Sequence, residues 1–173
     1  VVGSVNEITD LKTSQRNLKY IAYHDTLTLL YNKDKLYKDI NSMGTESFAC
    51  IMIDLIKFKL VNDRFGYAVG DGILKEVALR LQSTFDDSNS SIYRWGGDEF
   101  IIILKYTAPD QIQEASSKID EIFNRNFQIG DHNFSLTARS GISLYNESES
   151  EKSIEAIIKQ AEMAMYELKK VNT

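Results

Sequence analysis

The chain has a single cysteine and only two histidines among its 173 residues. Cys50 lies within an apolar run, where a thiol is typical of a buried core, so a disulfide framework and a cysteine metal site are both excluded. His24 and His132 are isolated, and neither has the spacing to other ligand residues that a metal site requires. We therefore interpret all three residues as structural.

The chain also lacks a block of positive charge and a long apolar run. It has 20 Lys and Arg against 25 Asp and Glu, a net charge of −5. Broad nucleic-acid binding needs a positive face to meet phosphates, so no nucleic-acid partner is expected. No run is long and apolar enough to span a membrane, and no signal peptide is visible. We expect a cytoplasmic domain and, since the sequence begins at Val1 rather than Met, part of a longer protein.

The segment from Arg94 to Phe100 carries the strongest local pattern, because two glycines and two carboxylates stand between strand-like runs. The step Gly96-Gly97 predicts a tight β-hairpin with both glycines at positive φ, as in a type I′ turn. Asp98 and Glu99 then lie just past the hairpin tip, where glycine lets a ligand approach the backbone. Adjacent carboxylates are hard oxygen ligands for Mg²⁺. The alternative is an acidic surface hairpin without a ligand.

A second candidate site follows the apolar stretch from Phe48 to Ile53, which predicts a central strand buried on both faces. Asp54 ends that stretch, and a carboxylate there is costly unless it is paired or bound to a cation. It can instead be the N-cap of the next helix. Further on, Asn62 and Asp71 flank two glycines. Such side chains can pair with the edge of a base, or they can form turns.

Strand-like and helical patterns alternate along the chain, and this predicts one α+β domain of ordinary size. Apolar residues recur at helical spacing between Ile73 and Leu81, and Pro109, the only proline, precedes another helix. Hairpins mixed with crossover helices favour a mainly antiparallel sheet of the split βαβ type. Helices are expected at 33–43, after a cap at Asn32, at 111–126 and at 153–170, and strands at 47–54, 91–95, 99–105, 127–129 and 133–144.

Four segments together resemble the GGDEF family, the diguanylate cyclases, over residues 24 to 173 in order and at family spacing. The resemblance implies a palm-like, ferredoxin-like nucleotidyl-cyclase fold with a mainly antiparallel five-stranded sheet flanked by helices. The matching motifs are Gly96-Gly97-Asp98-Glu99-Phe100, Asp54-Leu55-x-x-Phe58-Lys59-x-x-Asn62-Asp63 with Gly66-x-x-x-Gly70-Asp71, Asp25-x-Leu27-Thr28-x-Leu30-x-Asn32, and Ala161-Glu162-x-Ala164-Met165-Tyr166-x-x-Lys169.

The resemblance implies the joining of two GTP molecules into cyclic di-GMP with release of pyrophosphate. Asp54, Asp98 and Glu99 would be the catalytic carboxylates. They would also hold Mg²⁺ or Mn²⁺, together with the backbone carbonyl of Leu55. The substrate would be bound by the base-reading pair Asn62 and Asp71, the backbone amides at Lys57 and Phe58, the turn glycines Gly96 and Gly97, and Lys169.

The chain also departs from the family pattern. Ile56 stands where a second Asp is usual, and the usual Gly-Arg after the last helix is absent. Leu29, Lys33 and Tyr67 replace a usual Gly, Arg and His. Two hypotheses therefore remain open. One is an active cyclase that works as a homodimer in bacterial signalling. The other is a degenerate GTP-binding domain that regulates an attached module, such as a cyclic-di-GMP phosphodiesterase.

Three further segments carry weaker patterns. Residues 1–10 resemble the closing strand of a PAS sensor domain, and 25–173 would be the GGDEF domain. Residues 11–24 predict a linker helix whose apolar seam of Ile8, Leu11, Leu18 and Ala22 is interrupted by Gln15. A plain amphipathic helix is the alternative.

Many family members carry Arg-x-x-Asp as a product site before the hairpin, and here the matching residues are Asp87-Ser88-Asn89-Ser90. Arg139 lies in an apolar strand-like stretch, so we expect it at a strand edge or paired with an opposite charge.

Overall fold

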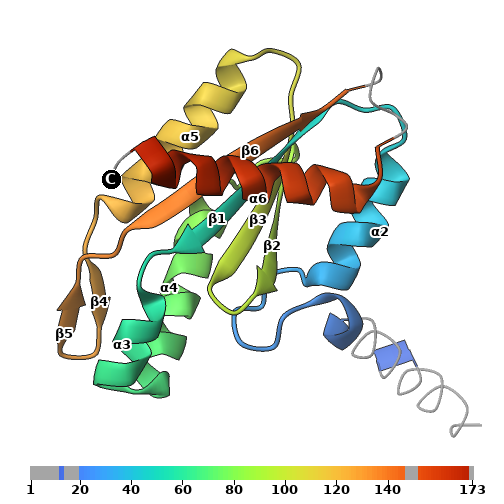
Figure 1. Cartoon of the computed structure of the whole chain (residues 1–173). Helices are drawn as coiled ribbons and strands as arrows, with labels where there is room; N and C mark the ends of the chain where they lie inside the picture. The colour runs from blue at the N-terminus through green and yellow to red at the C-terminus, as the bar shows by residue number, and fades with distance from the viewer. Residues whose placement is uncertain (1–11, 14–19, 147–151, 172–173) are drawn as a thin grey trace, which may run out of the picture.

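Four strands form one antiparallel sheet in the order β2-β3-β1-β6 (Figure 1). They are β1 (Phe48–Leu55), β2 (Ser90–Gly96), β3 (Glu99–Lys105) and β6 (Ala138–Tyr145). The computed structural model describes residues 12–13, 20–146 and 152–171, with the backbone alone for 168–171. All eight residues of β1 are buried, as expected for an apolar run in a central strand. The expected PAS-like tail and most of the linker seam lie outside the described residues.

The two faces of the sheet are covered by different helices, and each face has its own apolar core (Figure 1). One core joins alternate residues of β1 to α4 (Tyr67–Thr84) and α5 (Asp110–Phe123), with Phe58 of α3 (Phe58–Phe65). The other joins Phe48, Cys50 and Met52 of β1 to α2 (Lys33–Met43) and α6 (Ile154–Val171). An antiparallel sheet with helices on both faces confirms the predicted α+β class.

The prediction of five strands in one sheet is wrong. β4 (Phe127–Ile129) and β5 (His132–Phe134) pair only with each other, and the expected strand 133–144 is divided at residues 135–137. The separate hairpin packs against α3, because the ring of Phe65 lies 5.1 Å from that of Phe134 and 5.2 Å from that of His132. The side chains of β5 therefore contact a helix and leave the edge of the main sheet to β6.

The helix predictions hold in part. The side chain of Asn32 caps α2 by accepting a hydrogen bond from the amide of Lys35, and α5 starts directly after Pro109. The apolar spacing of residues 73–81 predicted only part of α4, which begins at Tyr67, and did not predict α3. The two helices follow each other directly, and Gly66, with a φ of 86°, separates them.

α6 lies unusually close to the sheet at Gly141. A Cβ built on Gly141 would be 2.1 Å from the carbonyl oxygen of Ala161 and 2.3 Å from the amide of Met165. Both are backbone atoms, so only glycine allows this approach. The contact brings Tyr166, which lies one residue beyond Met165, over the end of the sheet where the candidate site lies.

Within the described part of the chain, no helix combines the length and the apolar character needed to cross a membrane.

Candidate active site

Asp54 lies near the end of β1, between Glu99 of β3 and Arg139 of β6 in the strand register. Its residue is 8% exposed. Arg139 donates two hydrogen bonds to the same oxygen, Asp54 Oδ2, one from Nε at 2.7 Å and one from Nη2. The alternative of an N-cap at Asp54 is therefore wrong, because α3 begins after Lys57, which has a left-handed φ of 61° and no capping side chain. The expectation that Arg139 is paired is confirmed.

The hairpin between β2 and β3 is present, but its turn is shifted by one residue from the predicted Gly-Gly step. Gly96 pairs with Glu99, so the two central residues are Gly97 and Asp98. Only Gly97 has a positive φ, of 36°, and a positive φ at the first central residue alone is the pattern of a type II′ turn. The predicted type I′ turn is therefore wrong. A register shift between Arg94 and Gly96 accounts for it, because the extra residue moves Gly96 into the strand.

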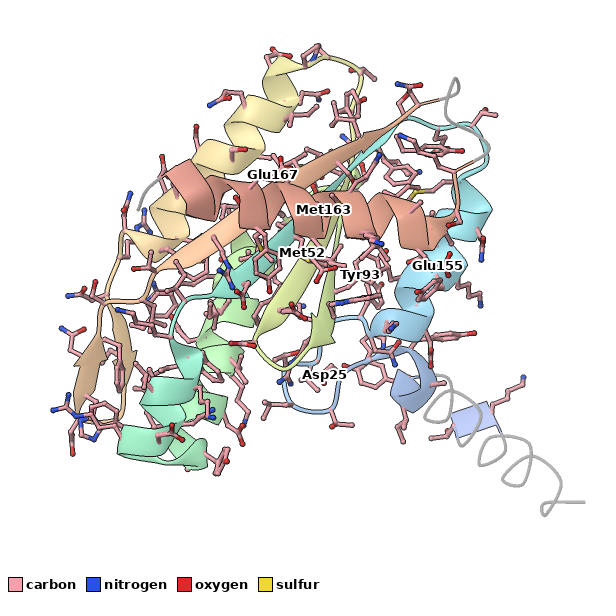
Figure 2. All side chains as sticks on the ribbon, viewed as in Figure 1. Asp25, Met52, Tyr93, Glu155, Met163 and Glu167 are labelled. Carbon is pink, nitrogen blue, oxygen red and sulfur yellow. The ribbon has the colours of Figure 1, made fainter. Side chains whose placement is uncertain are left out.

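Arg94 holds the turn in place. Its guanidinium donates to the carbonyl oxygen of Gly97 from Nε at 3.2 Å and Nη2 at 2.7 Å, and to Asp25 Oδ1 from Nη1 at 2.9 Å. Figure 2 labels Asp25 in the loop near the tip of the β2–β3 hairpin. Burial alone would raise the pKa of Asp25, but hydrogen bonds from Thr28 and Arg94 outweigh it and lower this pKa. No local pattern in the sequence links Asp25 to Arg94, because 69 residues separate them.

The two carboxylates of the turn are destabilised as anions. Burial, followed by the charge of Asp54, raises the pKa of Asp98. Burial, Asp54, Asp98 and Glu162 of α6 together raise the pKa of Glu99. Neither turn carboxylate has an ion-pair partner among the described residues. The amide of Leu55 donates to the carbonyl oxygen of Asp98 at 3.3 Å, so the turn is anchored to the end of β1.

The donors gathered here have the right chemistry for a hard cation, since Mg²⁺ and Mn²⁺ prefer carboxylate and carbonyl oxygens. The arrangement is not a ready-made metal site, however. No three acidic, imidazole or thiol groups stand close enough together for a metal within the residues described. Asp54 is already neutralised by Arg139. A cation would thus find Asp98 and Glu99 accessible but would meet the positive charge of Arg139 at Asp54.

A second polar position lies where α3 packs on α4. The side-chain oxygen of Asn62 is buried there, and it has no hydrogen-bond partner among the described residues. A Cβ built on Gly70 would be 1.8 Å from that oxygen and 3.2 Å from Cζ of Phe58. Asp71 follows Gly70 and is exposed. A buried acceptor without a partner costs about 1–3 kcal/mol, so this oxygen is suited to a donor supplied from outside the chain.

The comparison with known proteins decides the family. Residues 22–173 match the family described as "Diguanylate cyclase, GGDEF domain". The chain belongs to the GGDEF family.

Named relatives of this GGDEF domain are larger proteins. It is 34% identical over 143 residues to the bifunctional diguanylate cyclase/cyclic di-GMP phosphodiesterase MucR of Pseudomonas aeruginosa, which covers 79% of this chain and 21% of MucR. It is 33% identical over 165 residues to diguanylate cyclase A of Treponema denticola, which covers 93% of this chain and 41% of the relative. The chain thus spans less than half the length of either protein.

A solved structure agrees with the fold. The crystal structure of a sensory box/GGDEF family protein from Caulobacter crescentus superposes with a TM-score of 0.74 at 33% identity. The match covers 87% of this chain and 99% of that chain.

The structure of this GGDEF domain also places the remaining predicted residues. Lys57 is the N-cap of α3 and Phe58 is its first residue, two and three residues beyond the end of β1. Lys169 lies in the last turns of α6, and its side chain is outside the described residues. Leu29, which replaces a usual Gly, has a left-handed φ of 61°, a conformation that costs about 1–2 kcal/mol for a residue with a Cβ.

Proposed function

We propose that this GGDEF domain is a diguanylate cyclase, which condenses two GTP molecules into cyclic di-GMP and releases pyrophosphate. One observation supports it above the others. Asp54 and Glu99 face each other in the register of β1 and β3, and the turn that carries Asp98 is anchored to β1. Two of the family motifs, which are far apart in the sequence, thus lie side by side in the sheet.

The proposal assigns guanine recognition to Asn62 and Asp71. The edge of guanine presents N–H donors beside a carbonyl oxygen. A carboxylate accepts from those donors, and a side-chain amide both donates and accepts. The unpaired oxygen of Asn62 would obtain its missing donor in this way. Adenine presents a different order of donors and acceptors, so GTP is favoured over ATP. Gly96 and Gly97 let the phosphates approach the turn, with the amides at Lys57 and Phe58 and the ammonium of Lys169 as further partners.

In the proposed reaction the ribose 3′-hydroxyl of each GTP attacks the α-phosphate of the other, so two phosphodiester bonds form and close the ring. At each attack the bond to pyrophosphate breaks, one pyrophosphate leaves, and the hydroxyl proton is given up. Glu99 is the candidate to accept that proton, because its raised pKa brings it closer to neutral pH, as suits a general base. Mg²⁺ or Mn²⁺, held by Asp54, Asp98, Glu99 and the Leu55 carbonyl, would neutralise charge on the attacking and leaving oxygens.

The proposal includes a homodimer, since each domain holds one of the two GTP molecules and turnover needs both. An upstream sensor domain would control how the two domains meet, and a phosphodiesterase domain is the candidate for a further module. The reaction would take place in the cytoplasm, where GTP is available.

A second function has its own support. The guanidinium of Arg139 is bonded to the carboxylate of Asp54, and Ile56 stands where the family usually has a second acidic residue. Both features favour a domain that binds GTP and regulates an attached module without turning GTP over.

Product formation separates the two functions. The protein is incubated with GTP and Mg²⁺, or Mn²⁺ in a parallel reaction, and cyclic di-GMP is measured by liquid chromatography and mass spectrometry. Asp98→Asn is the matched control, because it is nearly isosteric and lies in a half-exposed turn. We expect product from the unaltered chain and at least a hundredfold less from Asp98→Asn. GTP binding without product in the unaltered chain would favour the regulatory function, and equal rates in the two would contradict the role of Asp98.

A further inference from the structure

We propose that Arg139 is a built-in competitor of the divalent cation: its guanidinium occupies the Asp54 carboxylate, and a metal ion binds there only after Arg139 has moved away. The inference rests on the proposed function, because it takes Asp54 as a metal ligand. It goes beyond that function by assigning control of metal affinity to a residue of β6.

The first support is the geometry of the pair. Asp54 and Arg139 face each other directly in the register of β1 and β6. Two donors of the guanidinium converge on Oδ2 alone. The side chain of Asp54 is 12% exposed and that of Arg139 is 25% exposed. Water and salt screen such a pair far less than a surface pair, so the arginine is a strong local rival for any cation.

The second support is the way in which Arg139 is held from the other side. Its Cζ lies 4.8 Å from the centre of the Tyr166 ring, within the range of a cation–π contact. Tyr166 is on α6, which is fixed against β6 at Gly141. The guanidinium therefore contacts both the Asp54 carboxylate and the Tyr166 ring. The Tyr166 contact offers it a partner when a metal ion takes the carboxylate.

The third support is the balance of charge around the pair. The negative charges of Asp98, Glu99 and Glu162 lie close enough together at this end of the sheet to affect one another. Glu99 and Glu162 have no ion-pair partner among the described residues. A cation that binds here is attracted by all of them, yet Arg139 neutralises the most buried carboxylate. Removing the arginine leaves Asp54 buried and unpaired, a state that a divalent ion relieves.

The test measures the binding of Mn²⁺ alone, without nucleotide, by calorimetry and by the electron paramagnetic resonance signal of free Mn²⁺. Arg139→Ser should bind Mn²⁺ at least ten times more tightly than the unaltered chain. Lys105→Ser is the matched control, because it removes one positive charge from the other end of β3, where Lys105 pairs with Glu46. It should leave Mn²⁺ affinity unchanged. Adding Asp54→Asn to Arg139→Ser should abolish the gain.

A readout of stability excludes a merely structural role. If Arg139 competes with metal, the melting temperature of Arg139→Ser should fall in EDTA and recover with Mn²⁺, and the unaltered chain should respond much less. Arg139→Lys is the second variant in case Arg139→Ser does not fold. Lysine keeps the charge but cannot donate as a rigid fork, so Mn²⁺ affinity should lie between those of the unaltered chain and Arg139→Ser.

Equal Mn²⁺ affinity in the unaltered chain and in the folded variants would overturn the inference. So would a loss of melting temperature in Arg139→Ser that Mn²⁺ does not restore. Tighter Mn²⁺ binding in Arg139→Ser with no cyclic product from any variant would contradict the proposed cyclase and leave the inference standing.

Discussion

Gly70 and Asn62 approach each other so closely that a Cβ built on Gly70 would lie 1.8 Å from Asn62 Oδ1. The two residues belong to successive helices, and the oxygen has no hydrogen-bond partner in the described part of the chain. A glycine thus makes room for an acceptor that is buried and unused. This relationship gives Gly70 a role in positioning Asn62 as well as in packing α4 on α3.

The first prediction concerns Gly70→Ala. The methyl group displaces the side chain of Asn62, so GTP affinity measured by calorimetry should fall at least tenfold. The protein should stay folded, because alanine is favoured over glycine in a helix by about 1 kcal/mol and offsets part of the clash. Gly72→Ala is the control on the same helix, since its Cβ would meet a side-chain methyl of Ile129 at 2.7 Å instead. Unchanged GTP affinity in Gly70→Ala would contradict this role.

The second prediction concerns Asn62→Ala. We expect weaker GTP binding and a reduced preference for GTP over ATP, because one of the two groups that read guanine is lost. The free energy of unfolding, measured with urea, should not fall, since the change removes a buried acceptor that has no partner. A clear loss of stability, or an unaltered nucleotide preference, would show that this oxygen serves the fold and not the ligand.

The third prediction concerns the pH dependence of stability through Glu99. Its pKa is raised in the folded chain, so the folded state binds this proton more readily than the unfolded state does. The contribution of Glu99 is therefore most favourable below the unfolded pKa, about 4, and is lost as the pH rises through the folded pKa.

Glu99→Gln cannot lose a proton at this position. The variant should be more stable than the unaltered chain at pH 7 in EDTA, and the difference should shrink towards about pH 3, where both side chains are neutral. Urea unfolding across this range gives the comparison, and the acidic end serves as its internal control. A Glu99→Gln variant that is less stable at pH 7 would indicate that the carboxylate is held by a favourable partner.

The fourth prediction concerns the absence of product feedback before β2. Asp87 there accepts a hydrogen bond from the amide of Asn89 at 2.9 Å, and its negative charge would repel the phosphates of cyclic di-GMP. Calorimetry should show no tight binding to the unaltered chain at this place. The double variant Asp87→Arg/Ser90→Asp restores the usual Arg-x-x-Asp and should gain affinity. Micromolar binding by the unaltered chain that Asp87 or Ser90 variants remove would refute the prediction.

The fifth prediction concerns dimerisation. The apolar seam in residues 8–22 is about two heptads long, and helices that short are marginal in water. We expect a mainly monomeric chain of low activity at micromolar concentration, by light scattering and a GTP turnover assay. A strong parallel coiled coil fused ahead of Asp10 should raise turnover at least tenfold by concentrating the two sites. The same fusion with Asp98→Asn is the inactive control, and a chain that already forms an active tight dimer would contradict the prediction.

Local patterns were sufficient where neighbours in the sequence decide the structure. The apolar run before Asp54 became a strand buried on both faces, and Asn32 capped its helix. The GGDEF motif identified the family, because its residues are close in the chain and their order is distinctive. The central residues of the turn lie one position later than predicted. The register shift in β2 causes this difference, and it depends on how β2 pairs with β3.

Relations between distant residues were decided only by the tertiary structure. The sequence indicated that Arg139 needs a partner, but the partner, Asp54, lies 85 residues away and was chosen by the register of β6 on β1. The separate β4–β5 hairpin depends on packing against Phe65 of α3, and the closeness of Asn62 to Gly70 depends on how α3 meets α4. Sequence alone therefore determined the family, the class of fold and the candidate carboxylates. The tertiary structure decided which of these carboxylates is paired with a positive charge and how deeply each is buried, because both depend on what surrounds a side chain in space.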